Sequence, residues 1–218
     1  MKLISVNCGL PREVDWHGKT VTTAIFKQPL EGRVLLRELN LDGDRQADLT
    51  VHGGAHKAVY CYPFEHYSYW RAELPARDFP MGLFGENFTT EGLFEDSVYL
   101  GDRFSVGSAE VVVTQPRLPC YKLGIRFGSD EMVKRFLSSR RTGFYLAVAR
   151  QGDAGAGDAI HVISRDPNRV PVSLITRLYV TTHYTHDDMA SLEQALAVPA
   201  LPESWKKYLR DRLNRSHA

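Results

Sequence analysis

Short runs of apolar and β-branched residues, separated by Gly, Pro and Asp, dominate the chain up to about residue 165. Runs of this length and composition are typical of β-strands. They predict strands over residues 2–7, 21–27, 34–39, 59–62, 109–114, 144–149 and 159–164. The pair Gly101-Asp102, between two apolar runs, predicts a hairpin. Because few helices lie between the strands, the pattern favours a closed β-barrel over a doubly wound sheet.

Two segments within this region repeat their apolar positions at helical spacing. Phe64, Tyr67 and Leu74 form one stripe directly after Pro63, a residue that suits the first turn of a helix. A second stripe covers residues 132–137, with Ser129 or Asp130 as the residue that caps it. We expect one helix at each place.

Beyond residue 165 the pattern becomes helical throughout. Residues 166–171 have the composition of a linker, and helices are predicted over 173–183, 187–197 and 203–215. The sequence therefore predicts a mainly β domain with helices over 1–165 and a small three-helix segment over 170–216. Three short helices have a marginal core of their own, so we expect them to pack on the barrel or on a second subunit in a homodimer.

Composition and charge exclude several classes of protein. The chain has 218 residues, of which 43% are hydrophobic and 24% charged, which is typical of a globular protein. Its net charge of +1 lacks the basic excess of proteins that bind nucleic acid or anionic lipid. No apolar run is long enough to span a membrane, and the N-terminus lacks the pattern of a signal peptide. Three cysteines are too few for a disulfide framework, so we expect the reducing cytoplasm.

The segment from Thr114 to Leu123 has the clearest chemical character. Two prolines restrict the backbone around Arg117 and Cys120, which predicts a stiff loop. We expect Arg117 and Lys122 to favour the thiolate form of Cys120 by lowering its pKa. A thiolate beside cations can act as a nucleophile or as a ligand for a soft metal. The alternative is that Cys120 is a small buried hydrophobic residue.

Two glycine-rich segments are candidates for anion binding. Backbone N–H groups of such turns can cradle an anion, and Arg45 and Lys57 can hold a phosphate. His52 and His56 stand four residues apart, but Gly53 and Gly54 between them disfavour the helix that a zinc site of this spacing needs. A third segment, residues 84–93, contains a polar Glu86-Asn87 pair between aromatic residues.

Taken together, these segments resemble the MOSC family, which is named for the C-terminal domain of molybdenum-cofactor sulfurases. The matching pieces are LDGD at 41–44, VHGG at 51–54, GENF at 85–88 and QPRLPC at 115–120, in the family's order and spacing. The resemblance is closest to the YiiM branch, the N-hydroxylaminopurine resistance proteins. It covers residues 1–165 as the barrel, and the tail resembles that branch's three-helix segment.

The resemblance implies a molybdenum–pterin cofactor with Cys120 as the protein ligand to molybdenum. It implies reduction of small N-hydroxylated compounds, including hydroxylamino-purines, to amines. Electrons would come from a separate flavoprotein or heme chain. Candidate proton donors are Lys57, His52, His56 and Asp44. The residues that would contact the cofactor are Arg45, His52, Gly53, Gly54, Lys57, Glu86, Asn87, Gln115, Arg117 and Cys120.

Three other functions stay open from the sequence alone. The chain could carry the cofactor, or a persulfide on Cys120, without any reduction. It could be a hydrolase that pairs Cys120 with His52 or His56, although no hydrolase signature is present. A nucleic-acid binding module is disfavoured by the near-neutral charge.

Overall fold

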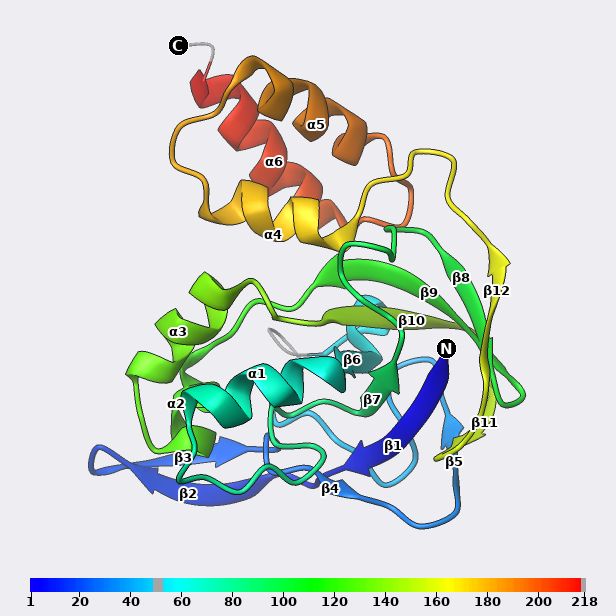
Figure 1. Cartoon of the computed structure of the whole chain (residues 1–218), viewed down its shortest axis with the longest axis vertical. Coiled ribbons are helices and arrows are strands. Elements are labelled where there is room, and N and C mark those ends of the chain that lie inside the picture. The colour runs from blue at the N-terminus through cyan, green and yellow to red at the C-terminus, as the bar shows by residue number, and fades with distance from the viewer. Residues whose placement is uncertain (49–52, 217–218) are drawn as a thin grey trace.

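The computed structural model describes residues 1–48 and 53–216, and its largest element is an eight-stranded sheet. The spatial order is β12-β8-β9-β10-β6-β7-β1-β4, as Figure 1 illustrates. β6 and β7 run parallel, and the other neighbouring strands are antiparallel. The strands are β1 (Lys2–Cys8), β4 (Gln28–Pro29), β6 (Val59–Pro63), β7 (Phe88–Glu91), β8 (Arg103–Val106), β9 (Ala109–Pro116), β10 (Phe144–Arg150) and β12 (Ile160–Ser164).

The sheet does not close into the barrel that the sequence predicts. Its ends approach each other, since Lys2 and Ala159 form an isolated antiparallel bridge. Only the start of β1 is available for such pairing, because its last residues pair with β4 through Asn7 and Pro29. The free edge of β1 is thus divided between two short contacts, and no continuous ladder joins it to β12.

Two small sheets flank the main one. β5 (Arg33–Leu36) pairs with β11 (Gly152–Gly155), and β2 (Arg12–Trp16) pairs with β3 (Lys19–Thr23). The strand predicted over residues 21–27 ends at Thr23. Beyond it, Ile25 N donates to the Thr23 hydroxyl and Lys27 N donates to the Ile25 carbonyl, so local bonds replace a ladder.

The hairpin predicted at Gly101-Asp102 is also displaced. Asp102 N donates to the Tyr99 carbonyl, so a turn is present. Only its second arm, β8, is a strand, and β8 forms its hairpin with β9 instead. The buried Asp102 carboxylate accepts from Tyr99 N and pairs with Arg165. These bonds tie the first arm of the turn to the chain beyond β12.

Six α-helices and one short 3-10 turn complete the described chain. α1 follows Pro63 and α3 follows Asp130, as the periodicity predicts. Around them, Tyr62, Trp70 and Phe136 belong to an aromatic core in which Trp70 Nε1 donates to the Tyr62 hydroxyl at 2.8 Å. The helical elements are η1 (Ala55–Lys57), α1 (Glu65–Glu73), α2 (Tyr121–Phe127), α3 (Glu131–Ser139), α4 (Val172–Val180), α5 (His186–Leu196) and α6 (Glu203–Ser216).

Of the three C-terminal helices, α4 lies against the sheet, and α5 and α6 pack on each other beyond it (Figure 1). α4 contacts β9, and the buried residues Ile175 and Leu178 join the same hydrophobic core as Val111 and Val113 of the sheet. α5 begins with a capping box in which Thr185 and Asp188 exchange hydrogen bonds. None of the helices in the described part of the chain is long and apolar enough to cross a membrane.

A glycine before β10 fixes the backbone beside the candidate site. Gly143 has a φ of +66°, and its carbonyl accepts from Arg117 N at 3.1 Å. A Cβ added there would lie 2.4 Å from the Cys61 carbonyl oxygen. We expect Gly143→Ala to lower the free energy of unfolding by about 3 kcal/mol or more in urea denaturation, because backbone strain and the clash add together. Gly157→Ala is the matched control.

Gly157 has a φ of +96°, but no heavy atom lies within 4 Å of its added Cβ. Its substitution should therefore cost about 1 kcal/mol, from backbone strain alone. Equal losses for the two variants would contradict the assigned contact between Gly143 and β6.

Candidate functional site

Cys120 lies in a pocket of about 100 Å³ between the sheet, α2 and the segment that follows β3. The thiol is partly exposed, whereas Cys8 and Cys61 are buried. Burial raises the pKa of Cys8 and Cys61 to about 12, so both are protonated thiols at neutral pH. The pocket is lined by Thr23, Ala24, Ile25, Lys27, Asp44, Arg45, Gln46, Ala47, Lys57, Tyr60, Gly85, Asn87, Arg117, Leu118, Cys120, Lys122 and Tyr145.

The backbone around Cys120 changes from strand to helix within four residues. β9 ends at Pro116, and Cys120 is the N-cap residue of α2. The helix α2 is not predicted above, although the sequence contains two signals for it. Leu123 and Phe127 are four residues apart and buried, and Gly128 ends the helix with a φ of +66°.

Arg117 is a buried cation at this pocket. Its side chain is 5% exposed, and its guanidinium carbon lies 4.9 Å from the ring centroid of Tyr60 and 5.1 Å from that of Phe136. The Nη1 atom is buried and has no hydrogen-bond partner among the described residues. A buried guanidinium nitrogen without a partner costs free energy. The arrangement therefore suits an anion bound in the pocket.

Further cations surround the same space. Lys57 and Lys122 line it, together with the exposed Arg45. Asp44 is the acidic side chain among the lining residues, and it forms a buried ion pair with Lys27. The lining therefore has a net positive charge, which attracts anionic ligands. Lys27 and Tyr145 are pocket residues that sequence analysis missed, because nothing in their local pattern marks them.

Asp44 holds the floor of the pocket together. Its Oδ1 accepts from Gly9 N at 2.8 Å as well as from Lys27, and its Oδ2 accepts from Asn87 Nδ2 at 2.9 Å. Asn87 Oδ1 in turn accepts from Tyr60 N at 3.0 Å. These bonds occupy both carboxylate oxygens of Asp44, the residue predicted as a proton donor.

Glu86 and Gln115 support the pocket from outside its lining. Glu86 is fully buried, and its carboxylate accepts from Gly82 N, Phe84 N and the Thr89 hydroxyl at 2.9 to 3.0 Å. Burial raises its pKa. Gln115 Nε2 donates to the His56 carbonyl at 3.4 Å. Both residues are predicted to contact the cofactor, and in the structure they bond to backbone groups near the pocket.

The glycine-rich segment positions Lys57. Gly54, with a φ of +96°, precedes η1, and its carbonyl accepts from Lys57 N at 2.9 Å. Gly53 stands just before this turn, and neither glycine lines the pocket. The His56 side chain is exposed and is not among the residues that line the pocket. His52, predicted as a catalytic and cofactor-binding residue, lies outside the described residues.

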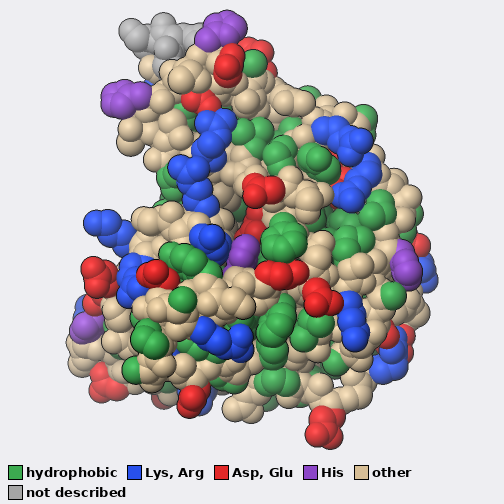
Figure 2. Space-filling model, viewed as in Figure 1, with side chains coloured by type: hydrophobic (Ala, Val, Ile, Leu, Met, Phe, Trp, Pro, Cys, Tyr) green, Lys and Arg blue, Asp and Glu red, His purple; other side chains and the backbone are tan. Residues whose placement is uncertain are grey.

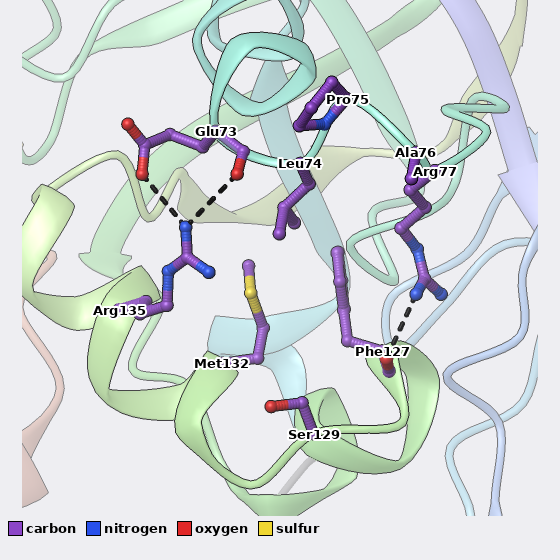
Figure 3. Close-up of a pocket in the computed structure, with 9 residues that line it drawn as sticks. All are labelled: Glu73, Leu74, Pro75, Ala76, Arg77, Phe127, Ser129, Met132 and Arg135. Carbon is purple, nitrogen blue, oxygen red and sulfur yellow. Dashed lines mark hydrogen bonds and ion pairs between the residues drawn. The ribbon is translucent and has the colours of Figure 1, made fainter.

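A larger cavity of about 330 Å³ lies elsewhere, between the end of α1 and helices α2 and α3 (Figure 3). Leu74, Phe127 and Met132 give it an apolar floor, and the Arg135–Glu73 ion pair closes one side. It contains none of the predicted site residues. Over residues 1–48 and 53–216, no group of three or more His, Cys, Asp or Glu side chains could hold a metal ion.

Lys57 gives the site a pH-dependent effect on stability. Burial lowers the pKa of its ammonium below 10.5. At neutral pH the cost of burying this charge is therefore fully present, and it is lost as pH rises through the lowered pKa. We expect Lys57→Met to raise the free energy of unfolding at pH 7, with the gain shrinking toward pH 10.5.

Urea denaturation at the two pH values measures this effect. Lys134→Met is the control, because Lys134 is exposed on α3 and its replacement should have little effect at either pH. A loss of stability in Lys57→Met at pH 7 would contradict the burial cost assigned to this ammonium.

Comparisons with known proteins identify the family of the chain. A family model described as "MOSC domain" matches residues 48–161, and one described as "YiiM-like, 3-alpha helix domain" matches 183–215. "Uncharacterized protein YflK" of Bacillus subtilis is 37% identical over 213 residues, which is 98% of this chain and 95% of that protein. "Protein YiiM" of Escherichia coli is 35% identical over 192 residues, 87% and 84% of the two chains.

A more distant relative and a solved structure extend the match. A "Reductase" of Gibberella moniliformis is 34% identical over 151 residues, which is 68% of this chain but 27% of that protein. The crystal structure of YiiM from Geobacillus stearothermophilus superposes with a TM-score of 0.80 at 32% identity, over 97% of this chain and 98% of that one. The chain therefore belongs to the MOSC domain family, and its C-terminal helices are those of the YiiM-like members.

Proposed function

We propose that this protein is a molybdenum-cofactor-dependent reductase that converts small N-hydroxylated compounds, such as hydroxylamino-purines, to amines. The observation that carries the proposal is the pocket itself. A partly exposed Cys120 shares it with several cations, and the buried Arg117 has a nitrogen that no described residue hydrogen-bonds. This combination offers a soft ligand beside an anion-binding surface.

The residues present fit an anionic molybdenum–pterin cofactor. Its phosphate and dithiolene sulfurs need cationic and polar donors, which Arg117, Lys57 and Lys122 provide at the pocket wall. Arg45 lines the exposed side of the pocket. Cys120 would be the protein ligand to molybdenum. When bound, the cofactor would supply two-electron redox chemistry at this position.

The chain's own residues orient the reactants and hold protons. Reduction of a hydroxylamine to an amine and water breaks the N–O bond and consumes two electrons and two protons. The half-buried Lys57 holds a proton at Nζ beside the pocket, and burial lowers its pKa. Both properties suit a proton donor. The Asp44 carboxylate already pairs with Lys27 and accepts hydrogen bonds from Gly9 and Asn87. We therefore propose that Asp44 positions the floor of the pocket and does not donate a proton.

Electrons must come from outside the chain, because it has no flavin or nicotinamide fingerprint. We therefore propose a separate flavoprotein or heme chain as the donor. The Gibberella moniliformis protein supports this view, since a segment like ours occupies 27% of a longer chain named "Reductase". A cytoplasmic location and a homodimer remain proposals, as does the absence of stable binding to nucleic acids.

Turnover with an artificial electron donor tests the proposal. Protein made in a host that overproduces the cofactor is mixed with a reduced viologen dye and 6-hydroxylaminopurine, and adenine is measured. We expect adenine to form with the dye and none to form with NADPH alone. Bound molybdenum without turnover would favour a non-redox carrier of the cofactor or of sulfur. Sustained turnover on NADPH would contradict the need for a partner.

The hydrolase alternative receives no support from the pocket. Its histidine candidates are His52, outside the described residues, and His56, whose exposed side chain does not line the pocket. A Cys-His pair needs the imidazole within hydrogen-bond reach of the thiol.

A further inference from the structure

Two arginines contact the ring of Phe26, and a third is bonded to the backbone of one of them, all outside the lining of the Cys120 pocket. The guanidinium carbon of Arg12 lies 3.6 Å from the Phe26 centroid, and that of Arg126 lies 5.1 Å from it. Arg77 donates from Nη2 to the Arg126 carbonyl at 2.7 Å and from Nη1 to the Phe127 carbonyl at 3.0 Å. Figure 3 shows this second bond at the rim of the larger cavity. Residues from β2, α2 and the loop after α1 therefore meet at one place.

Positive charge is in excess in this cluster, because the buried Glu86 attracts Arg126 less strongly than Arg77 repels it. Arg12, Arg77 and Arg126 have no ion-pair partner among residues 1–48 and 53–216. Burial, followed by repulsion from Arg77 and Arg12, lowers the pKa of Arg126. Arg77 Nε is buried without a hydrogen-bond partner in the described structure. Like charges held together in partial burial cost stability, and a bound anion would remove that cost.

We propose that Arg12 and Arg126 form a binding site for a phosphate group, with Arg77 and Phe26 as positioning residues. Arg126 Nε donates to the Leu83 carbonyl at 3.3 Å, and the terminal nitrogens of Arg126 make no hydrogen bond to the described residues. Two guanidinium groups match the charge of a phosphate monoester, and each can bind it through two parallel hydrogen bonds. The Phe26 ring sets the positions of both groups through cation–π contacts.

The phosphate site adjoins the pocket of Cys120. Ile25 and Lys27 line that pocket and flank Phe26 in the chain. On α2, Lys122 lines the pocket one helical turn before Arg126. A ligand with a phosphate group could therefore bind here and extend toward the pocket. The proposal does not depend on the proposed reductase activity, because phosphate binding can be measured in protein without the cofactor.

Calorimetric titration of the full chain, purified without the cofactor in phosphate-free buffer, tests the proposal. The probes are inorganic phosphate, adenosine 5′-monophosphate and adenosine. We expect the monophosphate to bind and adenosine not to bind. Arg12→Gln and Arg126→Gln should each weaken binding by about tenfold, the size of one charge-assisted hydrogen bond lost. Arg150→Gln should not, because Arg150 is an exposed partner of Glu110.

The outcomes separate the possible sources of the phosphate group. Tighter binding of the monophosphate than of inorganic phosphate would support a phosphorylated ligand, whereas equal binding would support free phosphate. Equal binding of adenosine and the monophosphate would overturn the proposal, as would affinities that neither variant changes. Should Arg126→Gln fail to fold, Arg12→Gln decides alone, since Arg12 is exposed at the start of β2. If the protein binds phosphate but shows no reductase activity, the proposed function is contradicted and the phosphate site is supported.

Discussion

Replacing Cys120 by alanine is expected to abolish binding of molybdenum, from about one atom per chain to a trace, and to reduce turnover to background. Cys120 is the partly exposed cysteine at the cationic pocket, so its sulfur is the soft ligand of the proposed site. Elemental analysis of protein from a host that overproduces the cofactor measures the loss. Because the Cys120 side chain is partly exposed, its truncation should leave the free energy of unfolding nearly unchanged.

Cys61→Ala is the matched control for this experiment. Cys61 is fully buried in β6, where its sulfur lies 3.3 Å from the Thr90 hydroxyl, and burial raises its pKa to about 12. The variant should keep its molybdenum. Undiminished molybdenum in Cys120→Ala, with the host's cofactor supply verified, would remove Cys120 as the ligand. Equal loss in both variants would indicate a folding defect instead of a lost ligand.

Local signals in the sequence account for the elements that it predicts well. Thr185 begins α5 with a capping box, and the residue three positions later is acidic, as such a cap requires. The Val111–Val113 run lies within β9, whose alternate residues are buried. At the candidate site, the prolines around Arg117 predict a loop, and residues 117–120 belong to neither β9 nor α2. In each case the determining interactions lie within a few residues of each other.

Features that depend on distant residues escape such reasoning. β6 and β7 pair in parallel, with Cys61 opposite Phe88, although α1 lies between the two strands in the sequence. No local pattern predicts that register. Residues 152–155 are rich in glycine and contain no apolar run, so their sequence does not indicate a strand. They form β11 because β5 pairs with them. Closure of the barrel likewise depends on which segment occupies the free edge of β1, and β4 occupies part of it.

The same limit applies to the chemistry of the site. Asp44 appears in the sequence as a polar turn residue with a free carboxylate. In the structure it is buried, because Lys27 and Asn87 approach it from segments remote in the chain. Glu86 differs, because its donors Gly82 N and Phe84 N lie within its own loop. Residue type and motif spacing indicated three segments that contribute to the pocket lining, 41–44, 85–88 and 115–120. The division between pocket lining and support required the fold.

Replacing Lys27 by methionine is expected to lower the free energy of unfolding by about 3–5 kcal/mol. The side chains of Lys27 and Asp44 are 9% and 2% exposed, so the ion pair is almost fully removed from water. Loss of the ammonium leaves a buried carboxylate with only neutral donors, from Gly9 and Asn87. For a chain of this size, that loss corresponds to a fall in Tm of roughly 10 °C, measurable by thermal denaturation.

Two further variants separate this charge effect from simple loss of packing. In Lys27→Met with Asp44→Leu, both charges are absent, so stability should recover part of the loss even though Asn87 and Gly9 lose an acceptor. Arg37→Gln breaks an exposed ion pair with Asp42 and should change stability little, because water replaces the partner. A double variant less stable than Lys27→Met alone would show that the hydrogen bonds of Asp44, more than its pairing with Lys27, hold this side of the pocket. Lys27 and Asp44 both line the pocket. We therefore expect Lys27→Met and the double variant to bind the cofactor more weakly, and the variant with the larger loss of stability to bind it least.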